Sequence, residues 1–155
     1  MLKHLEITQF RFVRFQKELK ALLYPDAAPV AKVSVYAAPD RITYAEAMKG
    51  SYRPAKVGEK FGPGWSTHWF RIEYVIPKAW RGREVLLHFN STSEACVWKD
   101  GVPLQGLTNY NWGPQDIRSY FTLTPSAKGG ETGTLYVEAA INGLFGLSDG
   151  GGLNQ

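Results

Sequence analysis

An unbroken alternation of side chains between residues 67 and 76 most limits what this chain can fold into. Successive side chains of a β-strand point to opposite faces, so a period of two marks an extended segment. The alternate positions form two sets. One set holds Trp69, Arg71, Glu73 and Val75, the other holds Phe70, Ile72, Tyr74 and Ile76, and Pro77 follows. The pattern predicts a strand with one buried face.

Similar but shorter patterns predict more strands along the chain. Asp100-Gly101 separates two of them, and both residues tolerate the positive φ that a tight hairpin requires. The region from Pro25 to Gly64 is less regular, with a short alternation at Ala31–Tyr36 and a possible helical turn at Tyr44–Lys49. The further strands are expected at Glu84–Asn90, Glu94–Lys99, Val102–Gln105, Tyr120–Thr124 and Thr134–Ile141.

These short strands predict a mainly β fold, a jelly-roll-like β-sandwich of the galactose-binding-like layout with an N-terminal helix. A length of 155 residues suits one domain, and 16 Gly and 9 Pro favour tight turns over helix bundles. We expect residues 1–25 to form the helix, 26–146 the sandwich, and 147–155 a Gly-rich linker that ends before a catalytic domain.

The N-terminal segment from Leu2 to Tyr24 is predicted to be an amphipathic helix that ends before Pro25. A basic amphipathic helix can bind a membrane or act as a transit peptide. Glu6 and Glu18 dilute the basic face, which favours packing on the domain or on a partner subunit. Its apolar positions are Leu5, Phe12, Phe15, Leu19 and Leu22.

Charge and composition argue against several classes of protein. The net charge of +4 is spread along the chain, without the basic run of a nucleic-acid-binding arm. No apolar run is long enough to span a membrane, and the charged start does not lead into a secretory signal. Cys96 is the only cysteine, and its apolar neighbours Ala95 and Val97 predict a buried thiol. We expect a cytoplasmic protein.

The sequence contains no visible catalytic or metal-binding constellation. A glycosidase needs two facing carboxyl groups, but Glu73, Glu94 and Asp100 are unpaired in sequence. His4, His68 and His88 are too far apart in sequence to indicate a metal site. We therefore assign no catalytic residue and no metal ligand.

Aromatic and amide side chains in two predicted loops are the best candidates for a binding site. Aromatic faces stack on sugar C–H surfaces, and amides exchange hydrogen bonds with hydroxyl groups. The same residues could instead plug the ends of the sandwich or bury against another domain. They are Phe61 and Trp65 around a Gly-Pro-Gly turn, and Asn109, Tyr110 and Trp112 before Gly113-Pro114.

Four ordered blocks give the chain a resemblance to a known family. They are Tyr52–Arg71, Ile76–Val85, Val97–Leu107 and Leu135–Gly146. The most specific parts are Phe61-Gly62-Pro63-Gly64-Trp65 and Asn142-Gly143-Leu144-Phe145-Gly146. Together they resemble the N-terminal region of class II, cytosolic or vacuolar type α-mannosidases of glycoside hydrolase family 38.

The resemblance implies a retaining hydrolase that removes α-linked mannose from free oligosaccharides with zinc and an aspartate nucleophile. Those groups belong to a catalytic domain after this segment, so the segment itself is expected to hold no cofactor and to be inactive alone. It would serve assembly or substrate framing in a homo-oligomer, without nucleic-acid or membrane partners, in the cytoplasm or alternatively in a vacuole or lysosome. The alternative is a stand-alone carbohydrate-binding or protein-interaction module.

Overall fold

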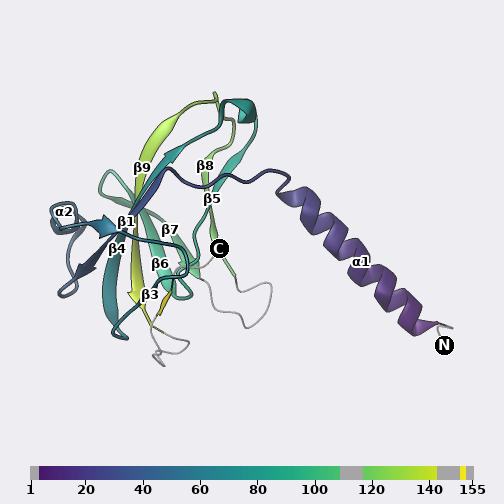
Figure 1. The fold of residues 1–155 in the computed structure, drawn as a ribbon, viewed down its shortest axis with the longest axis horizontal. Helices are drawn as coiled ribbons and strands as arrows, with labels where there is room; N and C mark the ends of the chain where they lie inside the picture. The colour runs from purple at the N-terminus through teal and green to yellow at the C-terminus, as the bar shows by residue number, and fades with distance from the viewer. Residues whose placement is uncertain (1–3, 109–116, 143–150, 153–155) are drawn as a thin grey trace.

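A computed structural model of the chain describes residues 4–108, 117–142 and 151–152. Antiparallel strands are the commonest secondary structure among these residues, and one long helix lies at the N-terminus (Figure 1). The helices are α1 (Leu5–Leu23), α2 (Tyr44–Ala47) and the 3-10 helix η1 (Lys78–Trp80). The strands are β1 (Lys32–Ala38), β2 (Arg53–Pro54), β3 (Lys60–Phe61), β4 (Ser66–Val75), β5 (Val85–His88), β6 (Glu94–Lys99), β7 (Val102–Thr108), β8 (Tyr120–Thr124), β9 (Thr132–Ile141) and β10 (Gly151–Gly152).

The main sheet has six strands in the order β2-β1-β4-β9-β6-β7. Two smaller pairs, β5-β8 and β3-β10, make up the other sheets. Strands β4 and β9 form the centre of the main sheet, paired over ten residues from Ser66↔Ile141 to Val75↔Thr132. A sandwich needs a second layer that covers one face of its main sheet, and the β5-β8 pair belongs to that layer. This arrangement confirms the predicted jelly-roll class.

The principal core lies on the inner face of the main sheet. Phe70 is fully buried and pairs with Val35 of β1 on one side and Val137 of β9 on the other, both also buried. Leu87 of β5 and Phe89 join the same cluster from the smaller layer. Alternation along β4 therefore builds the core as the sequence predicts.

All of the predicted strands are present, most of them with shifted ends. The hairpin at Asp100-Gly101 is confirmed, since its two residues have φ values of 51° and 82°. The alternation at residues 31–36 is part of β1, and the helical turn expected at residues 44–49 is α2. The strand predicted at 102–105 extends to Thr108, where a bridge to Arg118 prolongs the pairing.

The prediction that β4 has only one buried face is wrong. Trp69, on the opposite side from Phe70, is only 1% exposed. Residues 36–52, including α2, cover this outer face and create a second cluster there. We call its six rings the outer aromatic cluster: Tyr36, Tyr44, Tyr52, Trp69, Trp98 and Tyr136.

Cys96 also departs from its prediction, because its thiol is only partly buried. Its neighbours Ala95 and Val97 point into the principal core. A strand sends adjacent side chains to opposite faces, so Cys96 lies on the outer face beside Glu138 of β9. Partial burial, followed by the Glu138 charge, raises the pKa of the thiol.

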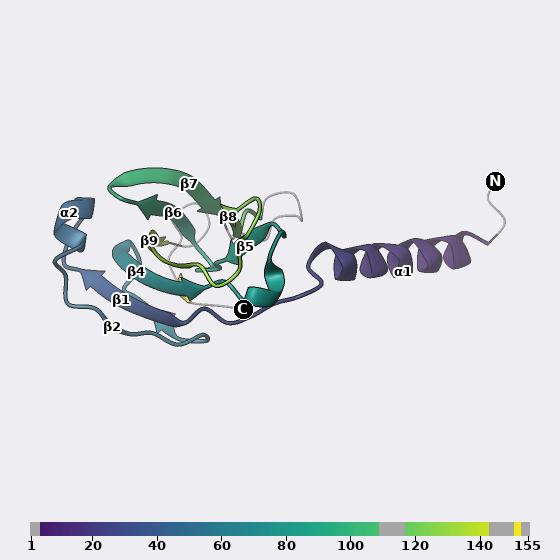
Figure 2. The same cartoon turned by 90° about the horizontal axis from the view of Figure 1, so that it is seen from above.

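Helix α1 stands away from the sandwich in both views (Figures 1 and 2). None of its residues is buried. The expectation that its apolar face packs on the domain is therefore wrong in this structure, and packing on a partner subunit stays a prediction. Among the described residues, no helix is long and apolar enough to cross a membrane.

The two-residue strands β2, β3 and β10 were not predicted, because two residues carry no periodic signal. Gly151 and Gly152 of β10 pair with Phe61 and Lys60 of β3. These two glycines fall within the segment expected to be a linker.

Candidate functional site

The two described members of the predicted aromatic site have opposite environments. Phe61 is only 7% exposed and joins the principal core, where its ring meets Phe70 edge to face at 5.2 Å between centroids. Trp65 is 67% exposed. Phe61 is thus buried, and Trp65 is the exposed one of these two residues.

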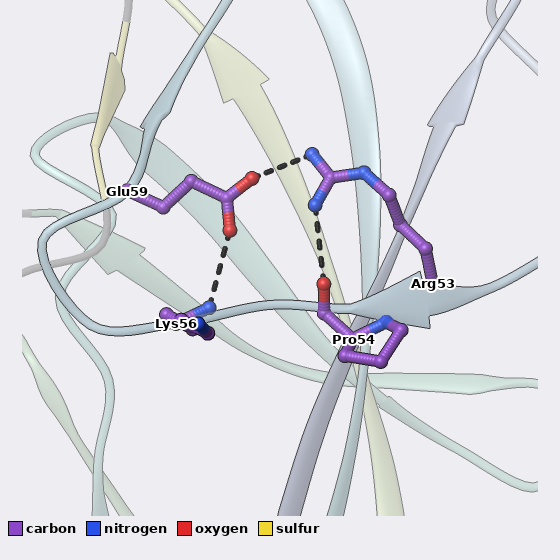
Figure 3. Close-up of polar contacts among 4 residues, drawn as sticks. All are labelled: Arg53, Pro54, Lys56 and Glu59. Carbon is purple, nitrogen blue, oxygen red and sulfur yellow. Dashed lines mark hydrogen bonds and ion pairs between the residues drawn. The ribbon is translucent and has the colours of Figure 1, made fainter.

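Polar contacts join Arg53 and Pro54 of β2 to Lys56 and Glu59 in the loop that leads to β3 (Figure 3). A guanidinium nitrogen of Arg53 lies 2.6 Å from one oxygen of Glu59, and the backbone N–H of Lys56 donates to the other at 3.1 Å. Arg53 also donates to the Pro54 carbonyl at 3.1 Å and lies over the Phe61 ring at 6.0 Å. The hydrogen bond from Arg53 is the main reason why the pKa of Glu59 is lowered.

Trp65 has a left-handed backbone conformation with φ of 68°, which is uncommon for a large residue. The backbone N–H of Trp65 donates to the Ile141 carbonyl at 2.6 Å, and the backbone N–H of Ser66 donates to the Pro63 carbonyl at 3.2 Å. Such a conformation costs about 1–3 kcal/mol and persists only where surrounding contacts fix it. Here those contacts present an indole to solvent at the end of β9.

Next to this corner, His68 is buried on the inner side of β4 and lies 5.4 Å from the Phe61 ring. The Ser66 hydroxyl has one proton, which it donates to the Pro63 carbonyl at 2.6 Å. Nδ1 of His68 lies 3.3 Å from the same hydroxyl oxygen. Because the hydroxyl proton is already used, Nδ1 must carry a proton and donate it to that oxygen. Burial, followed by the Arg53 charge, lowers the pKa of His68, so the neutral ring is favoured.

Asn109, Tyr110 and Trp112 lie outside the described residues. The structure therefore neither joins them to Trp65 nor separates them from it. Their proposed role in carbohydrate or interdomain contact stays a prediction.

A large apolar groove opens where the segment after α1 passes over the sandwich. It has a volume of about 1130 Å³, and its lining includes the core residues Ile72, Leu87 and Phe89. An ion pair between Arg83 and Asp26 ties this segment to the sandwich. Ile72, Leu87 and Phe89 are buried, so the groove reaches the edge of the principal core without exposing it.

One end of this groove is walled by a stack of three rings. Tyr24 stacks on Tyr120 at 4.6 Å, and His88 stacks on the same ring at 4.6 Å. Burial lowers the pKa of His88, so this stack favours a neutral imidazole at neutral pH. Sequence reasoning missed it, because the three residues lie far apart along the chain.

The described residues hold no group of three or more His, Cys, Asp or Glu side chains placed to bind a metal ion. Of the carboxylates considered in the sequence, Glu73 lies on the outer face within 3.5 Å of Arg71 and 3.9 Å of Lys32. Its neighbours are therefore cations rather than a second carboxylate.

The outer aromatic cluster is another feature that sequence reasoning missed. Tyr44 of α2 meets Trp98 at 5.8 Å and Tyr136 at 5.6 Å, while Arg71 lies 5.1 Å from the centre of the Tyr52 ring. Trp98 donates its indole N–H to Glu138 at 3.2 Å. The available signal was the alternation itself, which places Trp69, Trp98 and Tyr136 on the face opposite the principal core.

Comparison with known proteins accounts for this combination of fold and motifs. Residues 28–155 match the family of jelly-roll domains of alpha-mannosidases. The chain belongs to this family.

Two individual alpha-mannosidases match nearly the whole chain, and a third matches about two thirds of it. Human alpha-mannosidase 2C1 is 40% identical over 158 residues, which cover 96% of this chain and 15% of the relative. Alpha-mannosidase G of Dictyostelium discoideum is 32% identical over 162 residues, which cover 99% and 15%. An alpha-mannosidase of Saccharomyces cerevisiae is 30% identical over 105 residues, which cover 66% and 9%.

The chain therefore spans about 15% of the length of the first two of these relatives. Since the matched family runs from residue 28 onward, it includes the sandwich and begins after α1. The jelly-roll domain is thus the part of an alpha-mannosidase to which this chain corresponds.

Proposed function

We propose that this chain is the N-terminal, non-catalytic domain of an α-mannosidase that hydrolyses α-linked mannose in free oligosaccharides. Its membership of the alpha-mannosidase jelly-roll family carries the proposal. The small share of each relative that it matches adds support, because most of such a polypeptide lies outside this region.

The domain's proposed contribution is assembly and the framing of a catalytic domain. Two exposed apolar features support this role, since contiguous exposed apolar surface marks interaction sites. One is Trp65, which a strained backbone holds in solvent, and the other is the apolar groove beside Tyr24. Zinc and the nucleophile are proposed to belong to the catalytic domain, in a homo-oligomeric cytoplasmic enzyme.

A synthetic aryl α-mannoside tests whether catalysis requires the rest of the enzyme. A full-length α-mannosidase that contains this domain should hydrolyse it, whereas the 155-residue chain should give no turnover above buffer, with or without added zinc. Turnover by the 155-residue chain would contradict the proposal.

The framing role is tested in the same full-length enzyme at Trp65. Trp65→Ala should weaken contact between this domain and the remainder, measured as faster protease cleavage between them, while Trp65→Phe retains an apolar ring and most of the protection. Equal cleavage rates for wild type and both variants would show that Trp65 does not contribute to the interface.

A second candidate function is carbohydrate binding by the domain alone, and the exposure of the Trp65 indole is the observation in its favour. Titration of the chain with mannose oligosaccharides should then give saturable heat that Trp65→Ala abolishes and Trp65→Phe partly retains. Absence of heat in the wild-type chain at millimolar sugar excludes this function.

A further inference from the structure

Five of the large apolar residues of helix α1, together with Thr8, follow a heptad pattern, while Ile7, Phe10, Val13 and Leu23 lie outside it. Positions 5, 8, 12, 15, 19 and 22 are separated by three, four, three, four and three residues. This spacing defines the a and d positions of a coiled coil, which form one narrow seam along a helix. The seam residues are Leu5, Thr8, Phe12, Phe15, Leu19 and Leu22.

No element among the described residues covers this seam. Its five apolar residues are between 46% and 74% exposed, and the helix projects from the sandwich in both views (Figures 1 and 2). A side chain gains stability by leaving water, so a seam of this kind favours a partner helix with a matching pattern.

We propose that α1 pairs with α1 of a second copy of this chain, antiparallel and through this seam. The inference rests on the assembly role within the proposed function and specifies the partner and its orientation.

Charge complementarity supports the antiparallel orientation. Arg11 and Glu18 lie along one edge of the seam, at the g positions of the heptads. When Phe12 of one copy faces Phe15 of the other, Arg11 of each copy lies beside Glu18 of the other. Two-fold symmetry repeats the ion pair, as expected of an isologous interface.

The other edge of the seam agrees with this arrangement. Gln9 and Gln16 occupy its e positions, and the same antiparallel register places Gln9 of one copy beside Gln16 of the other. In a parallel pair, the neighbour of Glu18 would be Leu23 of the second copy, and that of Arg11 would be Gln16. A parallel pair therefore gains no ion pair from these residues, and e and g positions are those that set helix orientation.

An existing contact prepares Glu18 for this role. The Arg14 side chain donates to one carboxylate oxygen of Glu18 at 2.8 Å within the same helix. A carboxylate accepts several hydrogen bonds, so its second oxygen remains suited to Arg11 of the second copy. The intrahelical pair thereby limits the rotamers of Glu18 before association.

Sedimentation equilibrium of the full 155-residue chain tests the pairing. The apparent mass should rise from 17.3 kDa toward twice that value as the concentration increases. Phe12→Ala should weaken dimerisation at least about tenfold, since a buried aromatic contributes well over 1.4 kcal/mol. Phe10→Ala is the matched control, because Phe10 is 69% exposed on the same helix but lies outside the seam.

Charge exchange tests the orientation. Arg11→Glu should weaken the dimer about fivefold by placing like charges together twice, and adding Glu18→Arg should restore affinity to within about twofold of wild type. Lys17→Glu makes the same charge change outside the seam and should leave affinity unchanged. Because no residue of α1 is buried, these variants should keep the sandwich fold, which β-sheet circular dichroism verifies.

Three results overturn the inference: a monomer at every concentration, equal effects of Phe10→Ala and Phe12→Ala, or no recovery in the double charge variant. The monomer result would point to docking of α1 on another part of a longer polypeptide instead. Mass and mannoside turnover are separate readouts, so failure of the pairing leaves the proposed function standing.

Discussion

At the scale of single residues, two tryptophans four positions apart have opposite roles. Trp65 lies in solvent, whereas Trp69 is buried in the outer aromatic cluster and meets Tyr44 at 6.0 Å and Trp98 at 5.7 Å. The difference arises because residues 36–52 fold over Trp69 but do not reach Trp65.

This contrast predicts unequal costs of removing the two indoles. Trp69→Ala should lower the free energy of unfolding by about 3–5 kcal/mol, because it leaves a large cavity in packed surroundings. Trp65→Ala should change it by less than about 0.5 kcal/mol. Urea denaturation followed by circular dichroism measures both, and equal losses would contradict the assignment of Trp69 to a second core.

The burial of His68 predicts a pH dependence of stability. Its folded-state pKa lies below its usual value of about 6.5, so just below that pH the unfolded chain binds more protons than the folded one. The free energy of unfolding should therefore fall as the pH drops from about 6.5 toward the folded pKa, and His68 should contribute no slope above that window.

Urea titrations at several pH values between about 5 and 7.5 measure this slope. His68→Gln should reduce it, because the substitution removes the buried imidazole. His88 contributes in the same direction, since burial lowers its pKa too. An unchanged slope in His68→Gln would mean that the imidazole is not held neutral.

At the scale of elements, the β6-β7 hairpin shows how a turn fixes register. Asp100 and Gly101 both have positive φ, and the pairing of Lys99 with Val102 follows directly. An added Cβ at Gly101 would meet only the Tyr44 ring at 3.9 Å, an ordinary contact. Backbone conformation rather than crowding is therefore what requires glycine there.

Gly101→Ala should accordingly destabilise the domain by about 1–2 kcal/mol, the cost of a left-handed conformation for a residue with a Cβ. Gly106→Ala in β7 is the matched control, since nothing lies within 4 Å of its added Cβ and its φ is not positive. It should be neutral or slightly stabilising in thermal unfolding, and similar losses at both glycines would argue against the turn.

At the scale of the whole molecule, α1 and the sandwich are separable. No residue of α1 is buried, and the first contacts with the sandwich after it are the stack of Tyr24 on Tyr120 and the pair of Asp26 with Arg83. The domain's stability should thus depend on the segment after α1 but not on α1 itself.

Removal of residues 1–23 should leave the free energy of unfolding of the monomer within about 0.5 kcal/mol of the full chain. Removal of residues 1–30 should cost about 1 kcal/mol or more, because it also deletes the Tyr24 stack, the Asp26 ion pair and the packing of Val30. Both are measured in dilute samples, and a large loss on removing α1 alone would show that the helix packs on the sandwich.

The sequence by itself determined the longer strands, the hairpin and the family, because these depend on local periodicity, turn chemistry and ordered motifs. Alternation at Phe70 and Ile72 and the Asp100-Gly101 pair are examples. Only the tertiary structure decided which side chains are buried, since burial depends on what other segments cover each face. Residues 36–52 bury Trp69 on the second face of β4, the β3 pairing takes Phe61 into the core, and no described segment of the sandwich reaches the apolar seam of α1.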